Sequence, residues 1–379
     1  MSRQSTVPGL AAAVIALLLT SPAGAALTEA PRLAAVYDTI LAARFDRVEA
    51  QLKQACPPAP AEACAALGVV SLWWQILIEP ESRRLDKPFN DRAQAAVAAG
   101  EAWTKREPGR AEAWFYLAGA YAPLVQWRVL RGERLAAARD AKRIKDALER
   151  ALQLDPSLDD AHFGIGAYHY YADVAPAAAK VLRWLLLLPG GDRVKGLQEM
   201  LQARQRGALL GGEADYQLHV IYLWYEQKPL RAIELLQGLD ARYPSNPLFQ
   251  QRIAEVQDVW LHDRSASAAA WQILLDRARE GRVDNPPRTE GRARLGLARL
   301  AASRGDDARA REQLEALLAM RTAPPIVLAS AYIEYARLLE RAGDRVRAIE
   351  NSRHAAQVAG GDSRAQDDAR TALRRLGAS

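Results

Sequence analysis

One local pattern recurs along the chain and constrains its fold more than any other feature. A bulky residue is followed, after two others, by a large side chain and then usually by glycine or alanine. In chain order the segments end at Leu67-Gly68, Leu117-Ala118, Ile165-Gly166, His219-Val220, Leu297-Ala298 and Tyr335-Ala336. Units that recur in this way cannot bury their apolar faces alone, so the pattern predicts that neighbouring units stack.

A second helical pattern follows each later unit and carries an alanine where two helices would cross closely. These alanines are Ala232, Ala310 and Ala348, and prolines at 108, 156 and 244 close several units. The 379-residue chain holds 75 alanines and few β-branched residues, which favours helices over sheets.

The pattern resembles the tetratricopeptide repeat, in which helix, tight turn and helix alternate with small residues at the packing contacts. The best match is 213–244, where Ala232 and Pro244 sit at the family's spacings. The resemblance implies an all-α solenoid of stacked antiparallel helix pairs, about seven units with helical caps. The early steps, from Leu67 to Leu117 and from Leu117 to Ile165, exceed the usual period of about 34 residues. We therefore expect longer helices or an inserted turn there.

Four segments are expected along the chain. Residues 1–25 form a signal peptide, and 26–110 form an N-terminal helical cap with a first atypical repeat. Residues 111–246 form the central repeats with an inserted apolar helix and a Pro-Gly-Gly-Asp-Arg turn, and 247–379 form the C-terminal repeats with a capping helix.

The first 25 residues have the features of a cleavable export signal. Arg3 supplies the positive start, 10–20 is apolar, and Ala23-Gly24-Ala25 offers the small residues that a signal peptidase requires. The alternative is an uncleaved anchor, although the apolar stretch is short for a membrane span. We expect a periplasmic or secreted protein, and the excess of 43 arginines over 8 lysines favours a diderm bacterium.

Cys56 and Cys64 are the two cysteines of the chain, and they bracket a proline-rich stretch. A close pair in an exported protein is most simply a disulfide between two helices. Free thiols are the alternative, and two cysteines alone make a poor metal site because zinc prefers four ligands.

The segment between His162 and Gly212 departs from the repeat. It contains an apolar run at 181–188, which is too short to span a membrane, followed by Pro189-Gly190-Gly191 and by Asp192 as the expected cap of the next helix. This segment resembles uncharacterised exported bacterial tetratricopeptide proteins. It is distantly similar to the eukaryotic inclusion-body-clearance family, which is linked to lipid handling.

The sequence carries no recognised catalytic motif. It lacks a G-x-S-x-G elbow, an H-E-x-x-H pair and a Walker A loop, and its net charge of +6 is small for a nucleic-acid-binding chain of this length. His162 and His169 lie two helical turns apart, too far for one metal ion. We therefore expect no enzyme activity, no cofactor and no metal site.

The resemblance places partner binding on the first helix of each pair. The implied groove residues are Phe115, Phe163, Tyr170, Tyr171, Gln217, Trp224, Tyr225, Arg292, Arg299, Arg337 and Arg341. Such a groove would suit a protein or an extended peptide of the cell envelope with apolar anchors and an acidic end. The alternative is that the aromatic residues belong to the core and that the arginines are solvated.

The sequence thus predicts a non-catalytic protein- or peptide-binding scaffold of the bacterial cell envelope. The alternative function is a lipid or small-molecule carrier with an apolar cavity near residues 165–200. Tyr168, Tyr171, Trp184 and Leu188 would line that cavity.

Overall fold

The computed structural model describes residues 27–175 and 190–378, and these residues form 17 helices without a strand. The first helices are α1 (Ala30–Leu41), α2 (Phe45–Ala55), α3 (Ala61–Ile78), α4 (Asp86–Arg106), α5 (Ala111–Arg131), α6 (Arg134–Leu154), α7 (Ala161–Val174) and α9 (Arg193–Arg206). The others are α10 (Gly211–Trp224), α11 (Pro229–Arg242), α12 (Pro247–Val259), α13 (Arg264–Arg279), α14 (Pro286–Ser303), α15 (Asp307–Leu318), α16 (Pro325–Arg341), α17 (Arg345–Gln357) and α18 (Ser363–Arg375). The expected signal peptide 1–25 and the apolar run 181–188 lie outside the described residues.

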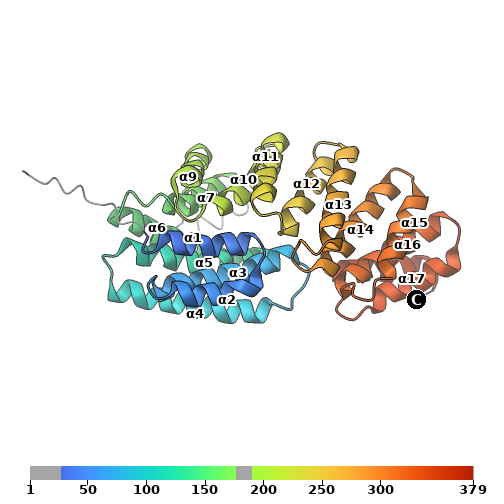
Figure 1. Cartoon of the computed structure of the whole chain (residues 1–379), viewed down its shortest axis with the longest axis horizontal. Helices are drawn as coiled ribbons and strands as arrows, with labels where there is room; N and C mark the ends of the chain where they lie inside the picture. Colours follow the sequence, from blue (N-terminus) through green and yellow to red (C-terminus); the bar gives the residue numbers. More distant parts are fainter. Residues whose placement is uncertain (1–26, 176–189, 379) are drawn as a thin grey trace, which may run out of the picture.

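The helices stack as pairs along an elongated molecule (Figure 1). After α1 and α2, which pack together at the N-terminal end, the described part of the chain has seven further pairs, α3–α4, α5–α6, α7–α9, α10–α11, α12–α13, α14–α15 and α16–α17, and α18 packs on the last of them. The protein is therefore an all-α solenoid of tetratricopeptide-like helix pairs, which confirms the expected fold class.

Small residues allow the helices of a pair to approach closely. Ala232, Ala310 and Ala348, the expected crossing alanines, are all fully buried. Between α7 and α9, a Cβ added at Gly166 would lie 2.6 Å from the Gly196 carbonyl oxygen, and one added at Gly196 would lie 2.5 Å from the Gly166 carbonyl oxygen. These two helices touch backbone to backbone, so neither position has room for a side chain.

The long early steps of the repeat come from long helices. α4, α5 and α6 each have 21 residues, whereas α10 and α11 have 14 each. Their greater length gives the N-terminal half a broad core, which extends from Leu27 to Ile165 and is joined by six buried residues from later in the chain, Leu209, Tyr216, Leu239, Tyr243, Leu248 and Phe249. The expected segments 26–110 and 111–246 both contribute buried residues to this core.

Helix α3 is the centre of that core. It is the one described helix with the length and hydropathy of a membrane span, and 67% of the span is buried inside the protein. Trp73 and Trp74 on α3 are almost completely buried. The apolar character of α3 is thus accounted for by packing against α1, α2, α4 and α5.

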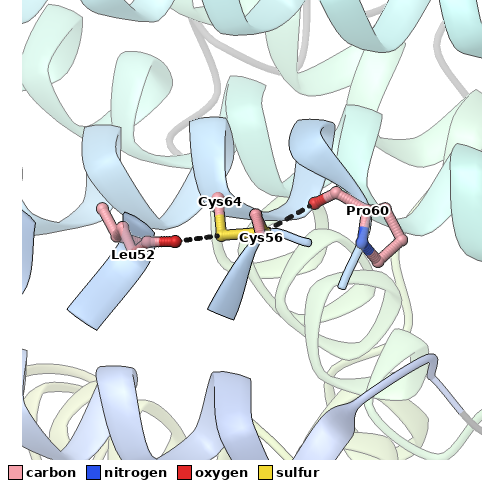
Figure 2. Close-up of a disulfide and its surroundings, with 4 residues drawn as sticks. All are labelled: Leu52, Cys56, Pro60 and Cys64. Atoms are coloured by element: carbon pink, nitrogen blue, oxygen red, sulfur yellow. Dashed lines mark hydrogen bonds between the residues drawn. A yellow bond between two sulfur atoms is a disulfide. The ribbon is translucent and has the colours of Figure 1, made fainter. Parts of the chain in front are cut away.

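The structure contains the expected disulfide between Cys56 and Cys64 (Figure 2). It joins the end of α2 to the first turn of α3, and the sulfur atoms of Cys56 and Cys64 lie 3.0 and 3.4 Å from the carbonyl oxygens of Pro60 and Leu52. The bond closes the proline-rich loop between two helices of the core.

Aspartate side chains cap five of the helices from α9 to α18. Asp192 accepts a hydrogen bond from the backbone N–H of Lys195 and caps α9, as the sequence predicts. Equivalent aspartate caps begin α13, α15, α17 and α18, at positions 263, 306, 344 and 362. Each satisfies backbone donors that the first turn of a helix leaves free.

Replacing both Cys56 and Cys64 by serine is expected to lower the free energy of unfolding by about 2.5 kcal/mol, because the closed loop restricts the unfolded chain. Urea denaturation of the oxidised wild type and of the double variant measures this difference. Under a reducing agent the wild type should approach the variant. Equal stability of the oxidised wild type and the variant would contradict the prediction.

Candidate functional site

The helices α1 and α3 lie against repeats that follow about 140 to 210 residues later. Tyr243 donates a hydrogen bond from its hydroxyl to Asp38 at 2.6 Å, and Asn246 donates to the carbonyl oxygen of Leu41 at 2.8 Å. These contacts hold α1 against the turn between α11 and α12. The solenoid therefore folds back on itself, and α1 packs against the middle of the chain.

Glu213 on α10 is the buried centre of this contact. Its carboxylate accepts hydrogen bonds from the Tyr37 hydroxyl at 3.0 Å, the Trp74 indole N–H at 3.2 Å and the Gln217 amide at 3.0 Å. Burial raises the pKa of Glu213, and the three donors oppose that effect by stabilising the charged form. One carboxylate thus links α1, α3 and α10.

Aromatic packing surrounds the same carboxylate. The ring of Trp74 lies 4.9 Å from that of Tyr216 and 5.9 Å from that of Phe249, centroid to centroid. Helix α3 therefore packs on α10 and α12, which are first helices of their pairs. Gln217, an expected groove residue, donates to Gln126 of α5 at 3.0 Å.

Two other expected groove residues are in the core. Phe115 is 5% exposed and Tyr170 is fully buried. Phe115 belongs to the core of the N-terminal half, whereas Tyr170 packs with Met200 of α9 and with Leu218 and Ile221 of α10, so neither side chain reaches solvent. The interpretation of both as groove-lining residues is corrected accordingly, while Phe163 and Tyr171 are half-buried beside Tyr170.

Arg292 on α14 is also engaged by the N-terminal part of the chain. Its guanidinium donates two hydrogen bonds to Glu81, at 2.6 and 3.1 Å, from the loop between α3 and α4. The bidentate geometry favours the charged forms of both groups, and Arg292 holds the pKa of Glu81 below its usual range although burial opposes this. Glu81 of the same chain therefore occupies the place beside Arg292 where we expected the acidic end of a bound peptide.

The three remaining arginines of the expected groove tie successive repeats together. Arg299 of α14 binds Glu334 of α16 at 2.9 Å, and Arg337 binds Asp368 of α18 at 2.7 Å. Arg341 binds Asp307, the first residue of α15, at 2.7 Å. All three stay about half exposed, but each charge already has an opposite charge from a neighbouring helix.

An exposed apolar surface lies where α10 and α12 end and where α11 begins. We call it the aromatic edge, and it consists of Tyr225, Trp224, Leu230, Val259 and Trp260. Trp224 is 64% exposed and stacks edge-on against Trp260 at 5.1 Å. Leu230 and Val259 are 65% and 62% exposed. Large exposed apolar residues gathered in this way are typical of interaction surfaces.

Charged groups fix one end of the aromatic edge. Glu226 accepts hydrogen bonds from the Arg193 guanidinium and from the Tyr170 hydroxyl, both at 2.7 Å. The bond from Arg193 lowers the pKa of Glu226 to about 2. Tyr225, beside Glu226, packs against Tyr171 at 5.5 Å, so its ring is held in a defined position.

Sequence reasoning identified two members of this edge, Trp224 and Tyr225, and missed the other three. Val259 could have been found, because the buried residues of α12 include Phe249, Ile253 and Val256, and Val259 lies off their stripe. Leu230 follows Trp224 across the turn between α10 and α11, whereas Trp260 joins the edge only because the end of α12 meets the end of α10 in space.

The described residues near the proposed carrier cavity are closely packed. Tyr170 and Met200 are fully buried and pack with Leu218 and Ile221 of α10. Tyr168 and Tyr171 are described, whereas the other two expected lining residues, Trp184 and Leu188, lie outside the described residues.

Several histidines and acids in the described ranges are buried or paired with other groups of the protein. Burial lowers the pKa of His219 to about 3, and His169 pairs with Glu199 at 2.7 Å. Asp160 accepts backbone N–H bonds from 208, 209 and 210 and so fixes the loop before α10. No group of three metal-binding side chains occurs within residues 27–175 and 190–378.

Comparison with known proteins indicates similarity at the level of fold. No family model and no curated protein sequence matches the chain. Solved structures that resemble it include the Cut9–Hcn1 hetero-tetramer of the APC/C, at 15% identity with a TM-score of 0.48. That match covers 90% of this chain and 55% of the other, so the chain spans about half the length of its structural neighbour.

Two further structures have similar scores. Yeast Tom70 has 13% identity and a TM-score of 0.45 over 82% of this chain and 64% of its own. A human IFIT1 dimer with m7Gppp-AAAA has 14% identity and a TM-score of 0.45 over 92% of this chain and 80% of its own. At these identities and scores the functions of those proteins are not transferred.

Replacing Glu213 by glutamine is expected to change how stability depends on pH. Because burial raises the pKa of Glu213, the folded chain holds a proton there more tightly than the unfolded chain. Relative to the variant, the wild type is thus most stable below pH 4.5, the ordinary value, and loses this advantage as the pH rises through the raised pKa. Urea denaturation of both proteins between pH 4 and pH 8 measures the difference.

The control for this measurement is Glu234→Gln on α11, whose carboxylate is 60% exposed. This variant should run parallel to the wild type over the whole range. A constant difference between wild type and Glu213→Gln across the range would contradict the assignment of Glu213 as a buried titrating group.

Proposed function

We propose that this protein is an exported, non-catalytic scaffold of the bacterial cell envelope that binds an apolar segment of a protein partner at the aromatic edge. The observation that carries the proposal is the exposure of Trp224, stacked on Trp260, on a chain whose other tryptophans that the structure describes are at least half buried. Tryptophan and tyrosine are the residue types that dominate binding energy at protein interfaces.

The surroundings of the edge support a protein or peptide ligand. Trp224 and Tyr225 end α10, and Leu230 lies in the first turn of α11, so the apolar side chains come from rigid helix ends. Rigid anchors lose little conformational entropy on binding. The nearby Arg193 and Lys228 are already paired with Glu226, so charge contributes little here and apolar contact dominates the recognition.

The expected groove contributes less to this function than the sequence indicates. Its members Gln217 and Arg292 are engaged by α5 and by the loop after α3. Of its four arginines, Arg299, Arg337 and Arg341 remain about half exposed, and a ligand acid there would have to replace an internal one. The aromatic edge needs no such replacement.

A lipid or small-molecule carrier is the second candidate. It is supported by the apolar composition of 181–188, which lies in the sequence between α7 and α9. Native mass spectrometry of the protein purified from the periplasm separates the two candidates. A retained lipid mass would favour the carrier, whereas a protein free of lipid that binds peptide would favour the scaffold.

Export is tested by expressing the whole chain in a diderm bacterium and determining the N-terminus of the periplasmic product. We expect the mature protein to begin at Ala26, because residues 23–25 end the signal. Recovery of the uncleaved chain in the membrane fraction would instead support the anchor.

Binding at the aromatic edge is tested with peptides selected by the purified protein from a random peptide library. Trp224→Ala is expected to weaken the best peptide by about 30-fold, since a tryptophan anchor contributes about 2 kcal/mol or more. Fluorescence anisotropy of the labelled peptide measures the dissociation constant.

A matched pair of valines provides the control for that experiment. Val259 lies in the edge and is 62% exposed, whereas Val346 on α17 is 78% exposed and lies outside it. Val259→Ser should weaken binding and Val346→Ser should not. Equal effects of the two serine variants, or no loss with Trp224→Ala, would show that the selected peptides bind elsewhere.

A further inference from the structure

A depression of about 230 Å³ lies where α13 and α15 flank the C-terminal half of α14. Helix α14 contributes Leu297, Leu300 and Ala301, each of which is 5 to 8% exposed. Ala268 and Ala269 line the side formed by α13, and their small side chains leave the space open. The depression is therefore mostly apolar on the sides that α13 and α14 form.

Two arginines line the depression where α14 ends and α15 begins. Arg304 is the C-cap residue of α14 and Arg309 lies in the first turn of α15, and both are exposed. Asp306, the one acid in the lining, caps α15 by accepting a hydrogen bond from the backbone N–H of Arg309 at 3.1 Å. The lining thus has a net positive charge, next to the end of α15 where the helix dipole is also positive.

The guanidinium groups of Arg304 and Arg309 have no partner within residues 27–175 and 190–378. Neither forms an ion pair or a side-chain hydrogen bond there. Arg299, Arg337 and Arg341, by contrast, each bind an acid of a neighbouring helix. A carboxylate of a ligand can therefore approach Arg304 and Arg309 without displacing an acid of the protein itself.

We propose that this depression binds an acidic, amphipathic segment of a protein partner. An aliphatic side chain of that segment packs against Leu297 and Leu300, and its carboxylates pair with Arg304 and Arg309. Charge complementarity identifies the ligand, because the planar guanidinium group matches the two oxygens of a carboxylate. The aliphatic side chain removes from water the apolar surface that the depression leaves accessible.

This site is separate from the aromatic edge and differs from it in chemistry. The edge is formed by the ends of α10 to α12, whereas the depression is formed by α13 to α15. Binding at the depression depends on exposed charges and therefore weakens as the salt concentration rises, while apolar contact at the edge does not depend on charge. A partner with an apolar and an acidic segment would use both sites.

The experiment tests the purified protein against a library of short peptides with blocked ends that combine glutamates with aliphatic residues. The best peptide is expected to bind the double variant Arg304→Gln with Arg309→Gln about tenfold more weakly than the wild type, because two exposed ion pairs are lost. Raising the salt concentration to about 0.5 M should weaken binding to the wild type by a similar factor. Isothermal titration calorimetry measures the dissociation constants.

Matched variants separate the depression from the rest of the surface. Arg321 is exposed and lies outside the depression, so Arg321→Gln should bind the peptide as the wild type does. Ala269→Phe fills the apolar part while both arginines remain, and it should weaken the same peptide several-fold. Ala95→Phe at an exposed position of α4 should have no effect. Circular dichroism verifies that each variant keeps its helices.

Equal affinity of the wild type and the double arginine variant would overturn the proposal. Unchanged binding by Ala269→Phe would also overturn it, because the arginines would then act as a charged surface without a depression. The same holds if no peptide of the library binds, or if free hexanoate binds at the arginines and the peptides do not. A failure of binding at the aromatic edge would leave these results unchanged, since Trp224→Ala alters only that edge.

Discussion

The hydrogen-bonded carboxylate of Glu213 is the interaction on which the arrangement of the N-terminal half depends. It accepts hydrogen bonds from α1, α3 and its own helix, and its side chain is buried. Removing one donor or acceptor from this hydrogen-bonded group leaves its partners buried and unpaired. The resulting loss of stability is larger than the free energy that the hydrogen bond itself contributes. The fold-back of α1 and α3 on α10–α12 is thus specified by a polar contact inside an apolar interface.

That fold-back changes what the solenoid can present to a partner. Stacked helix pairs normally leave the faces of their first helices open, and here α3, α5 and the loop after α3 contact several of them. Gln217 and Arg292 have partners from the same chain as a result. The aromatic edge around Trp224 lies at the ends of the helices, beyond the reach of these elements, and it stays exposed.

The exposed arginines of the C-terminal half also pair with groups of the same chain. Arg299, Arg337 and Arg341 each reach an acid on another helix, so the arginine surplus partly holds neighbouring pairs in register. A single exposed ion pair contributes little to stability. In a solenoid each repeat contacts only its neighbours, so a series of ion pairs between successive repeats acts at the interfaces that hold the stack together. The abundance of arginine in the sequence is therefore not by itself a sign of an acidic partner.

The local features of this protein could be predicted from its sequence. The crossing alanines, the seven helix pairs, the cap at Asp192 and the disulfide all depend on residues close together in the chain, where spacing and side-chain size determine the outcome.

The candidate surfaces could be predicted only in part. Trp224 and Tyr225 were identified, but the burial of Phe115 and Tyr170 and the pairing of Arg292 with Glu81 were not. Those outcomes depend on contacts between residues that are far apart in sequence, and a repeat pattern carries no information about them. The sequence by itself determined that helix pairs stack. Only the tertiary structure decided which faces they leave to solvent, because that depends on where the N-terminal helices find apolar surface to bury.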